Sequence, residues 1–136
     1  MKVFLDTNIF LYAFLNQDVA KKMVAVKILA TAIGNGNGYV SLQVAKEFCS
    51  VMTKKSSKPI SELAVALNLI SRFNCTAGSF EMVRRALEIK DQYGIQFYDA
   101  LIVAAAEANG CDEILTEDLN DGQMYCGIKA VNPFKE

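Results

Sequence analysis

Four acidic residues stand where strands are expected to end or helices to begin. Asp6 ends the apolar run Val3–Leu5, and Asp118 follows a later apolar run. Glu47 and Asp99 lie early in expected helices. In a parallel sheet the connecting helices run antiparallel to the strands, so strand carboxyl ends and helix amino ends share one edge. The pattern therefore predicts that four carboxylates meet in one cleft.

Carboxylates crowded into one cleft repel one another strongly unless a cation neutralises them. Oxygen ligands select Mg²⁺ or Mn²⁺ over zinc, and Mg²⁺ keeps several waters that leave room for the phosphate oxygens of a substrate. The alternative is that each acid caps a helix or a turn, which is a common role for any one of them. The joint placement of all four at one edge favours a metal site.

The sequence contains no histidine. This absence excludes Ser-His-Asp and Cys-His nucleophile systems, the paired histidines of a metal-free ribonuclease, and zinc or iron sites with histidine ligands. Carboxylate chemistry remains.

The elements that must position the acids are short apolar strands that alternate with helices. Strands are expected at residues 3–5, 39–41, 113–116 and 128–131, with a small one at 75–76. Helices are expected at residues 9–14, 19–33, 43–52, 61–73, 80–93 and 96–109. This alternation predicts a single domain over residues 1–136, a three-layer α/β/α sandwich whose central, mainly parallel sheet has about four to five short strands.

Residues at the helix ends give more local expectations. Thr7 and Asn8 are expected to cap the first helix, which would leave the carboxylate of Asp6 free for an ion. Asp18 and Ser79 are expected to cap later helices. The apolar residues of the second helix that are expected to face mostly inward are Met23, Val26, Ile28, Leu29 and Ile33.

Composition limits where the protein works. The formal net charge is −1, so no overall basic field attracts nucleic acid, although local patches can. The four cysteines are scattered without a C-x-x-C pair, which indicates small apolar fillers in a reducing compartment. The apolar run before Asp6 is too short for a signal peptide, and no later stretch is typical of a membrane span. These features predict a cytoplasmic protein.

Five fragments in this order resemble the PIN-domain family and, within it, the VapC-type toxins of toxin-antitoxin pairs. The fragments are Phe4–Asn8, Val44–Phe48, Tyr98–Ile102, Ile114–Gly122 and Val131–Phe134. The resemblance implies that Asp6, Asp99 and Asp118 hold Mg²⁺ or Mn²⁺ and that Glu47 completes the catalytic set. It implies supporting roles for Thr7, Asn8 and Thr116. Asn120 and Asp121 are also expected to support the site. Many relatives carry a further acid where this chain has Asn120, so a ligand at that position is in doubt, and the alternative for Asp121 is a turn residue only.

The activity implied by the resemblance is metal-dependent endonucleolytic cleavage of RNA. A metal-activated water would attack the phosphorus and leave 5′-phosphate and 3′-hydroxyl ends. The resemblance also implies a homodimer that is neutralised by a small antitoxin protein, for which Phe10, Tyr12, Phe14 and the apolar faces of the second and fourth helices are candidate docking surface. The basic residues expected to grip RNA are Lys46, Lys54, Lys55, Lys58, Arg84 and Arg85.

Three other functions compete with this one. A phosphatase of the haloacid-dehalogenase type also ends its first strand in an aspartate, but its D-x-D pattern fails because position 8 is Asn. A catalytically silent scaffold with the same fold would have no reason to keep mutually repelling acids together. Cleavage of DNA in place of RNA is the nearest alternative, and the sequence leaves it open.

Overall fold

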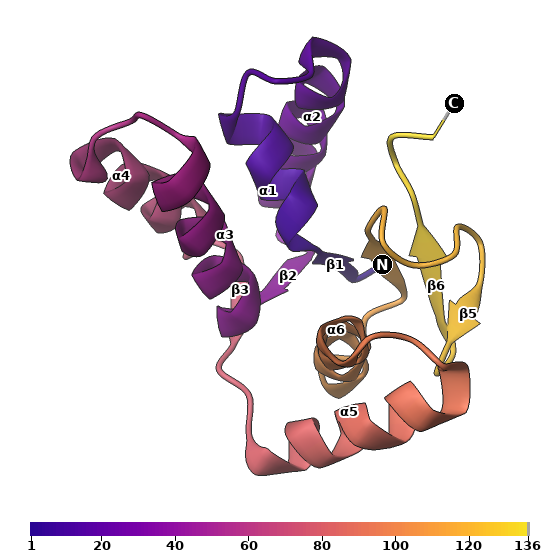
Figure 1. The fold of residues 1–136 in the computed structure, drawn as a ribbon. Helices are drawn as coiled ribbons and strands as arrows, with labels where there is room; N and C mark the ends of the chain where they lie inside the picture. Colours follow the sequence, from indigo (N-terminus) through magenta and orange to yellow (C-terminus); the bar gives the residue numbers. More distant parts are fainter. Residues whose placement is uncertain (136) are drawn as a thin grey trace.

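The computed structural model describes residues 1–135, which form helices and strands that alternate along most of the chain (Figure 1). The strands are β1 (Val3–Leu5), β2 (Gly38–Ser41), β3 (Asn74–Thr76), β4 (Glu113–Leu115), β5 (Met124–Tyr125) and β6 (Ile128–Val131). The helices are α1 (Thr7–Phe14), α2 (Val19–Asn35), α3 (Leu42–Lys55), α4 (Ile60–Ile70), α5 (Phe80–Tyr93) and α6 (Phe97–Ala108).

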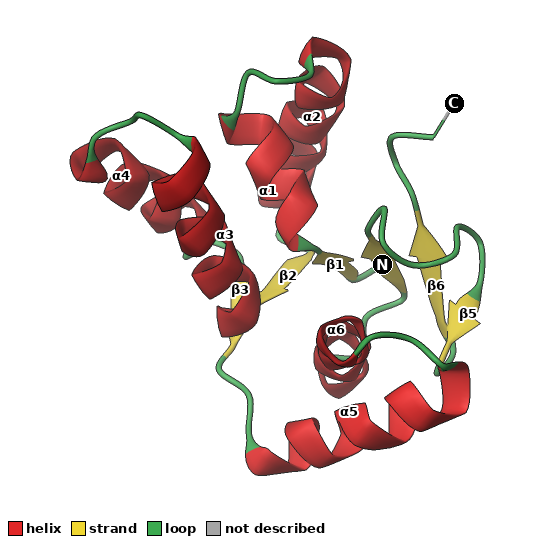
Figure 2. Cartoon of the chain, viewed as in Figure 1, coloured by secondary structure: helices red, strands yellow, loops and turns green. Residues whose placement is uncertain are grey.

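The strands form one six-stranded sheet in the order β3-β2-β1-β4-β6-β5, and every neighbouring pair is parallel except β5 with β6. The chain steps from β1 outward to β2 and β3, and then returns past β1 to β4. Right-handed crossovers therefore place α1 to α4 on one face of the sheet and α5 with α6 on the other. Figure 2 shows the strands between these two groups of helices. The predicted three-layer α/β/α sandwich is confirmed.

Most of the predicted helix ends are explained by capping. The side chains of Asp18 and Ser79 accept hydrogen bonds from the backbone N–H groups of Lys21 and Met82, so both predicted caps are confirmed. α5 ends at Tyr93 and is capped by Gly94, which adopts a left-handed conformation with φ 66°.

The sheet has one strand that was not expected, β5. It pairs with β6 across a two-residue turn in which both Cys126 and Gly127 have positive φ. Glycine at the second turn position is a turn signal, but two residues of strand are too few for alternation to reveal.

The prediction for the inner face of α2 was wrong in part. Leu29 is buried, whereas Met23 is 69% exposed and Val26 and Ile33 are also exposed. The face that packs inward uses the small residues Ala25 and Ala32 with Leu29, because α2 lies close against α1 and β2. Met23, Val26 and Ile33 therefore lie on the outer side of α2.

The cysteines also differ from the expected pattern. Cys111 is buried, but Cys75 is exposed and Cys49 and Cys126 are half-buried, so the prediction of apolar fillers holds for Cys111 alone. Among residues 1–135 all four cysteines are free thiols. In the same range no helix has the length and apolar character needed to cross a membrane.

Two glycines, one near the end of α2 and one at the start of β2, should respond in opposite directions to alanine. A Cβ at Gly38 would lie 2.6 Å from Cδ1 of Phe73, a buried ring already packed edge-on against Phe10. We expect Gly38→Ala to lower the free energy of unfolding by about 1–3 kcal/mol through overpacking. Gly34→Ala, in α2 with open space around the new Cβ, should raise it by up to about 1 kcal/mol. Urea unfolding of the two variants beside the wild type measures both; equal effects would contradict the packing argument.

Candidate active site

The centre of the candidate site is the contact between the ends of β1 and β4. Asp6 and Thr116 directly follow these strands, and the backbone N–H of Asp6 donates to the carbonyl of Leu115 at 3.1 Å. The Thr116 hydroxyl donates to Oδ2 of Asp6 at 2.8 Å. Both side chains are buried, with exposed fractions of 4% for Asp6 and 1% for Thr116. The sheet therefore fixes the Asp6 carboxylate at its carboxyl edge.

Asp6 is also the N-cap of α1. Its backbone is extended, with φ −76° and ψ 164°, and its Oδ1 accepts a hydrogen bond from the N–H of Thr7 at 2.7 Å. The prediction that Thr7 and Asn8 would cap this helix and leave Asp6 free was wrong. The helix begins at Thr7, two residues earlier than expected, so Thr7 and Asn8 already lie inside its first turn. One carboxylate serves both the strand end and the helix start.

The side chains of Thr7 and Asn8 reach two other acids instead. The Thr7 hydroxyl donates to Oε2 of Glu47 at 2.9 Å, and Nδ2 of Asn8 donates to Oδ2 of Asp118 at 3.3 Å. The backbone N–H of Asp118 donates to the Thr116 hydroxyl at 3.0 Å. Neutral donors around β1 and β4 thus connect Asp6, Glu47 and Asp118.

Asp99 lies in the first turn of α6, at the same edge of the sheet. It lines a hollow of about 450 Å³ together with Asp118 and the loop residues 94–96 that lead into the helix. The four predicted acids therefore come to one edge, as the sorting by strand and helix ends predicts.

The pKa values of three of these acids are raised. Burial raises the pKa of Asp6 to about 7, although hydrogen bonds from Thr116 and Thr7 oppose the shift, and the charges of Asp118 and Glu47 add to it. Loss of solvation raises the pKa of Asp99, and the charges of Asp118 and Glu47 raise it further. The pKa of Asp118 is raised by loss of solvation and by the charges of Glu117 and Glu47.

The charges that act on Asp6, Asp99 and Asp118 are all negative. These charges come from neighbouring acids, and among the described residues no lysine or arginine contributes to the three raised pKa values. Repulsion of this kind is relieved by a cation, and an all-oxygen donor set matches Mg²⁺ or Mn²⁺. The chemistry of the donors therefore fits a hard divalent ion.

The side chains do not form a closed cage around such an ion as they stand. Within residues 1–135 no group of three or more acidic or cysteine side chains is arranged closely enough to hold a metal. The arrangement is a set of four carboxylates at one edge of the sheet, of which Asp6, Glu47 and Asp118 are held by neutral donors.

The acidic turn after β4 supplies two residues that point elsewhere. Nδ2 of Asn120 donates to Gln123 at 2.8 Å. Oδ1 of Asp121 accepts from the backbone N–H of Asn132 at 2.8 Å, and its carboxylate lies 3.8 Å from Nζ of Lys135. Both residues stabilise the turn and the segment after β6.

The basic residues predicted to grip RNA are spread over three places. Lys46 is exposed on α3 beside Glu47 and lines a hollow of about 700 Å³. Lys54 and Lys55 were expected in a loop, but α3 extends through Lys55, so both are in its last turn, about 10 Å along the helix axis from Glu47. Lys58 follows in the exposed loop.

The two arginines of α5 are paired with acids. Arg84 forms an ion pair with Glu81 on the exposed surface. Arg85 makes two hydrogen bonds to the carboxylate of Glu107, at 2.8 and 3.0 Å, and contacts Glu88 at 3.4 Å. Arg85 therefore links α5 to α6, and its charge is already matched.

Sequence reasoning missed two groups of residues at the site. Gln43, four residues before Glu47, donates to its carboxylate, and this spacing on a helix is a signal that could have been used. A second group consists of Tyr12, Lys21 and Glu117. The Tyr12 hydroxyl donates to Glu117, and Nζ of Lys21 lies 3.1 Å from both. Its members are far apart in the sequence and give no local signal.

The fold is similar to those of several toxins and toxin-antitoxin complexes. A toxin-antitoxin complex from Klebsiella pneumoniae aligns with a TM-score of 0.73 and 21% identity, over 97% of this chain and 98% of that one. VapC20 of Mycobacterium tuberculosis gives 0.71 and 16%, over 94% and 99%. VapBC2 of Rickettsia felis gives 0.69 and 20%, over 96% and 97%. At these identities the similarity shows the fold.

The sequence itself identifies the family. No curated protein sequence is similar enough to count as a match. The profile of the PIN domain family, however, matches residues 3–120, which contain β1 to β4 and all four candidate acids. The chain belongs to the PIN domain family, as its five sequence fragments predicted.

Proposed function

We propose that this protein is a metal-dependent endoribonuclease and the toxin of a type II toxin-antitoxin pair. The observation that carries the proposal is the placement of Asp6, Glu47, Asp99 and Asp118 at one edge of the sheet, where the charges of Glu47 and Asp118 raise the pKa values of Asp6 and Asp99. Membership of the PIN domain family supports a hydrolase that cleaves nucleic acid. VapC20, whose fold is similar, is a toxin that cleaves the sarcin-ricin loop, which favours RNA over DNA as the substrate.

Asp6, Asp99 and Asp118 would hold Mg²⁺ or Mn²⁺. When bound, such an ion lowers the pKa of water and stabilises the charge that develops on phosphate oxygens. Thr116 and the N–H of Thr7 each use one lone pair of the Asp6 carboxylate, which keeps its orientation and leaves its other lone pairs available.

Glu47 would orient the attacking water, accepting a hydrogen bond from it on a carboxylate oxygen. Its two oxygens are held by Thr7 at 2.9 Å and Gln43 at 2.7 Å, so the carboxylate cannot rotate freely. In-line attack by water, with the ribose 3′ oxygen as the leaving group, gives 5′-phosphate and 3′-hydroxyl ends.

The proposed partners are a cognate antitoxin and a second copy of the chain. The complexes from K. pneumoniae and R. felis contain an antitoxin with a toxin of this fold, which supports the first. Phe10 was predicted to be part of the docking surface. It is fully buried in the core, so this part of the prediction is wrong. Tyr12 and Phe14 are half-buried. The outer sides of α2 and α4 expose apolar residues such as Met23 and Val65.

Removing the charge of a candidate ligand should abolish cleavage. We expect Asp6→Asn and Asp99→Asn to reduce the cleavage rate of a mixed cellular RNA substrate by at least about 100-fold with the fold intact. Asp91→Asn, an exposed aspartate late in α5, is the matched control and should cleave normally. Chelation by EDTA should stop the wild type, and Mg²⁺ should restore it.

Product ends and a DNA substrate complete this test. Sequencing that requires a 5′-phosphate should capture the cut sites of the wild type and not those of Asp99→Asn. Full activity in either variant would contradict the assignment of the site, and faster cleavage of a DNA copy of the substrate would favour the DNA alternative.

Lys46 and the pair Lys54 and Lys55 should differ in their contribution to RNA binding. Because Lys46 is adjacent to Glu47, we expect Lys46→Gln to reduce the slope of log affinity against log salt concentration by about 1. A double change of Lys54 and Lys55 to Gln tests the more distant end of α3. Fluorescence anisotropy over a series of salt concentrations measures the slope, in the catalytically inactive Asp99→Asn background. An unchanged slope for Lys46→Gln would exclude it from phosphate contact.

The pKa of Asp6 gives a pH dependence of stability in the absence of metal. The unfolded chain releases this proton near the ordinary pKa of 3.8, and the folded chain keeps it up to about 7. The folded state therefore binds more protons across this window, and its stability falls as the pH rises, by up to about 1.4 kcal/mol per pH unit from this group.

Urea unfolding in EDTA at several pH values, for the wild type and Asp6→Asn, isolates this contribution. The stability of the wild type relative to the variant should decline between about pH 4 and pH 7. Saturating Mg²⁺ should stabilise the wild type more above this window than below it, because protons compete with the ion. A stability difference that is flat across the window would contradict the raised pKa.

A further inference from the structure

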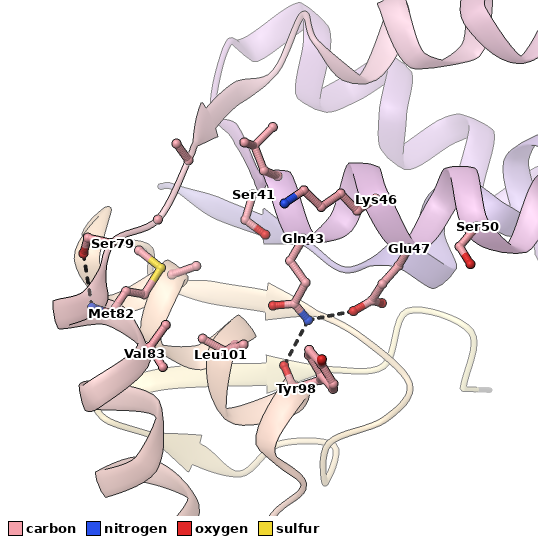
Figure 3. Close-up of a pocket in the computed structure, with 14 residues that line it drawn as sticks. Ser41, Gln43, Lys46, Glu47, Ser50, Ser79, Met82, Val83, Tyr98 and Leu101 are labelled. Atoms are coloured by element: carbon pink, nitrogen blue, oxygen red, sulfur yellow. Dashed lines mark hydrogen bonds between the residues drawn. The ribbon is translucent and has the colours of Figure 1, made fainter.

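The amide of Gln43 joins two elements of the candidate site. Nε2 of Gln43 donates to Oε1 of Glu47 at 2.7 Å and to the backbone carbonyl of Tyr98 at 3.2 Å. Figure 3 shows the Gln43 amide between these two acceptors, with α3 on one side and the start of α6 on the other. An amide nitrogen has two N–H donors, so both are used.

The two acceptors matter for different reasons. Glu47 is one of the four candidate acids, and its other oxygen is held by Thr7. Tyr98 immediately precedes Asp99, so its carbonyl belongs to the helical turn that carries this acid. Gln43 therefore connects the positions of Glu47 in α3 and Asp99 in α6. These two acids are close enough for the charge of Glu47 to raise the pKa of Asp99.

The hydrogen bonds of Gln43 differ from those of the other neutral donors in the elements that they connect. Thr7, Asn8 and Thr116 lie at the ends of β1 and β4, which are hydrogen-bonded neighbours in the sheet. α3 and α6 approach from opposite faces of the sheet, so the sheet itself does not set the distance between Glu47 and Asp99. The amide of Gln43 bridges that gap.

We propose that Gln43 is a positioning residue that holds the first turn of α6, and with it the candidate ligand Asp99, relative to Glu47, and thereby sets the affinity of the site for a divalent ion. This inference rests on the proposed function. Gln43 touches neither substrate nor ion; it acts through the two acids. Neighbours that orient the groups around a metal commonly contribute about 10- to 100-fold to metal affinity.

The surroundings of Gln43 allow a clean substitution. The side chain is half-buried and lines the hollow of about 700 Å³ between α3 and α5. Gln43→Met keeps the length and the helix propensity but removes both donors. Gln43→Asn keeps the amide but is one methylene shorter, so it cannot reach both acceptors. Ser50→Ala, on the same face of α3 and lining the same hollow, is the matched control.

The test is direct Mn²⁺ binding to the full chain without RNA, measured by titration calorimetry, with a thermal melt of each variant in EDTA. We expect Gln43→Met and Gln43→Asn to bind Mn²⁺ about 10-fold more weakly, and Ser50→Ala to match the wild type. In cleavage assays the Mg²⁺ concentration for half-maximal activity should rise in parallel.

The outcomes separate the inference from the function on which it rests. If both Gln43 variants bind Mn²⁺ as the wild type does, the inference is overturned and the proposed function stands, even where their Tm falls, because the amide then only ties α3 to α6. If the wild type itself binds no Mn²⁺, both the inference and the proposed function are overturned. If Gln43→Met does not fold, the affinity of Gln43→Asn decides.

Discussion

Uncompensated negative charge at the carboxyl edge of the sheet is the constraint around which the site is built. Asp6 is 4% exposed, and it lies within reach of the charges of Asp118 and Glu47. Isolated burial of this kind is costly, because an ionised carboxylate loses its hydration without gaining a countercharge. Among the described residues, neutral hydrogen-bond donors, rather than lysine or arginine side chains, contact these carboxylates. Hydroxyl, amide and backbone N–H groups hold the carboxylates of Asp6, Glu47 and Asp118 in place without cancelling their charge.

The neutral donors also explain why a few residues do several things. Thr116 donates to Asp6 and accepts from the backbone of Asp118, so one hydroxyl fixes two acids. Asp6 caps α1 while it faces the other acids, which means that the helix start and the candidate metal ligand cannot be changed independently. Asp6→Asn keeps an oxygen for the cap, whereas Asp6→Ala would remove the cap and the ligand together.

Prediction from the sequence succeeded where topology decides and failed where contacts between distant segments decide. Strand and helix ends place Asp6, Glu47, Asp99 and Asp118 at one edge of a parallel sheet, whatever the details of packing. The same reasoning could not find the role of Gln43, because its acceptor at Tyr98 lies 55 positions away in the sequence.

Three other features of the structure were not predicted, each for a physical reason of its own. The outward position of Met23 follows from the closeness of α2 to α1, which lets alanines fill the inner face. The pairing of Arg85 with Glu107 depends on how α5 packs on α6. The capping by Asp6 depends on a helix boundary that lies two residues earlier than expected, a difference within the precision of pattern reading.

The position of β6 has a consequence for the order in which the protein is made. The backbone N–H of Thr116 donates to the carbonyl of Val131 in β6, and β6 lies between β4 and β5 in the sheet. Because synthesis proceeds from the N-terminus, all four acids have been synthesised before the strand that steadies Thr116 exists. A nascent chain of this protein therefore carries all four candidate acids before it contains the strand that fixes Thr116, the residue whose hydroxyl holds Asp6.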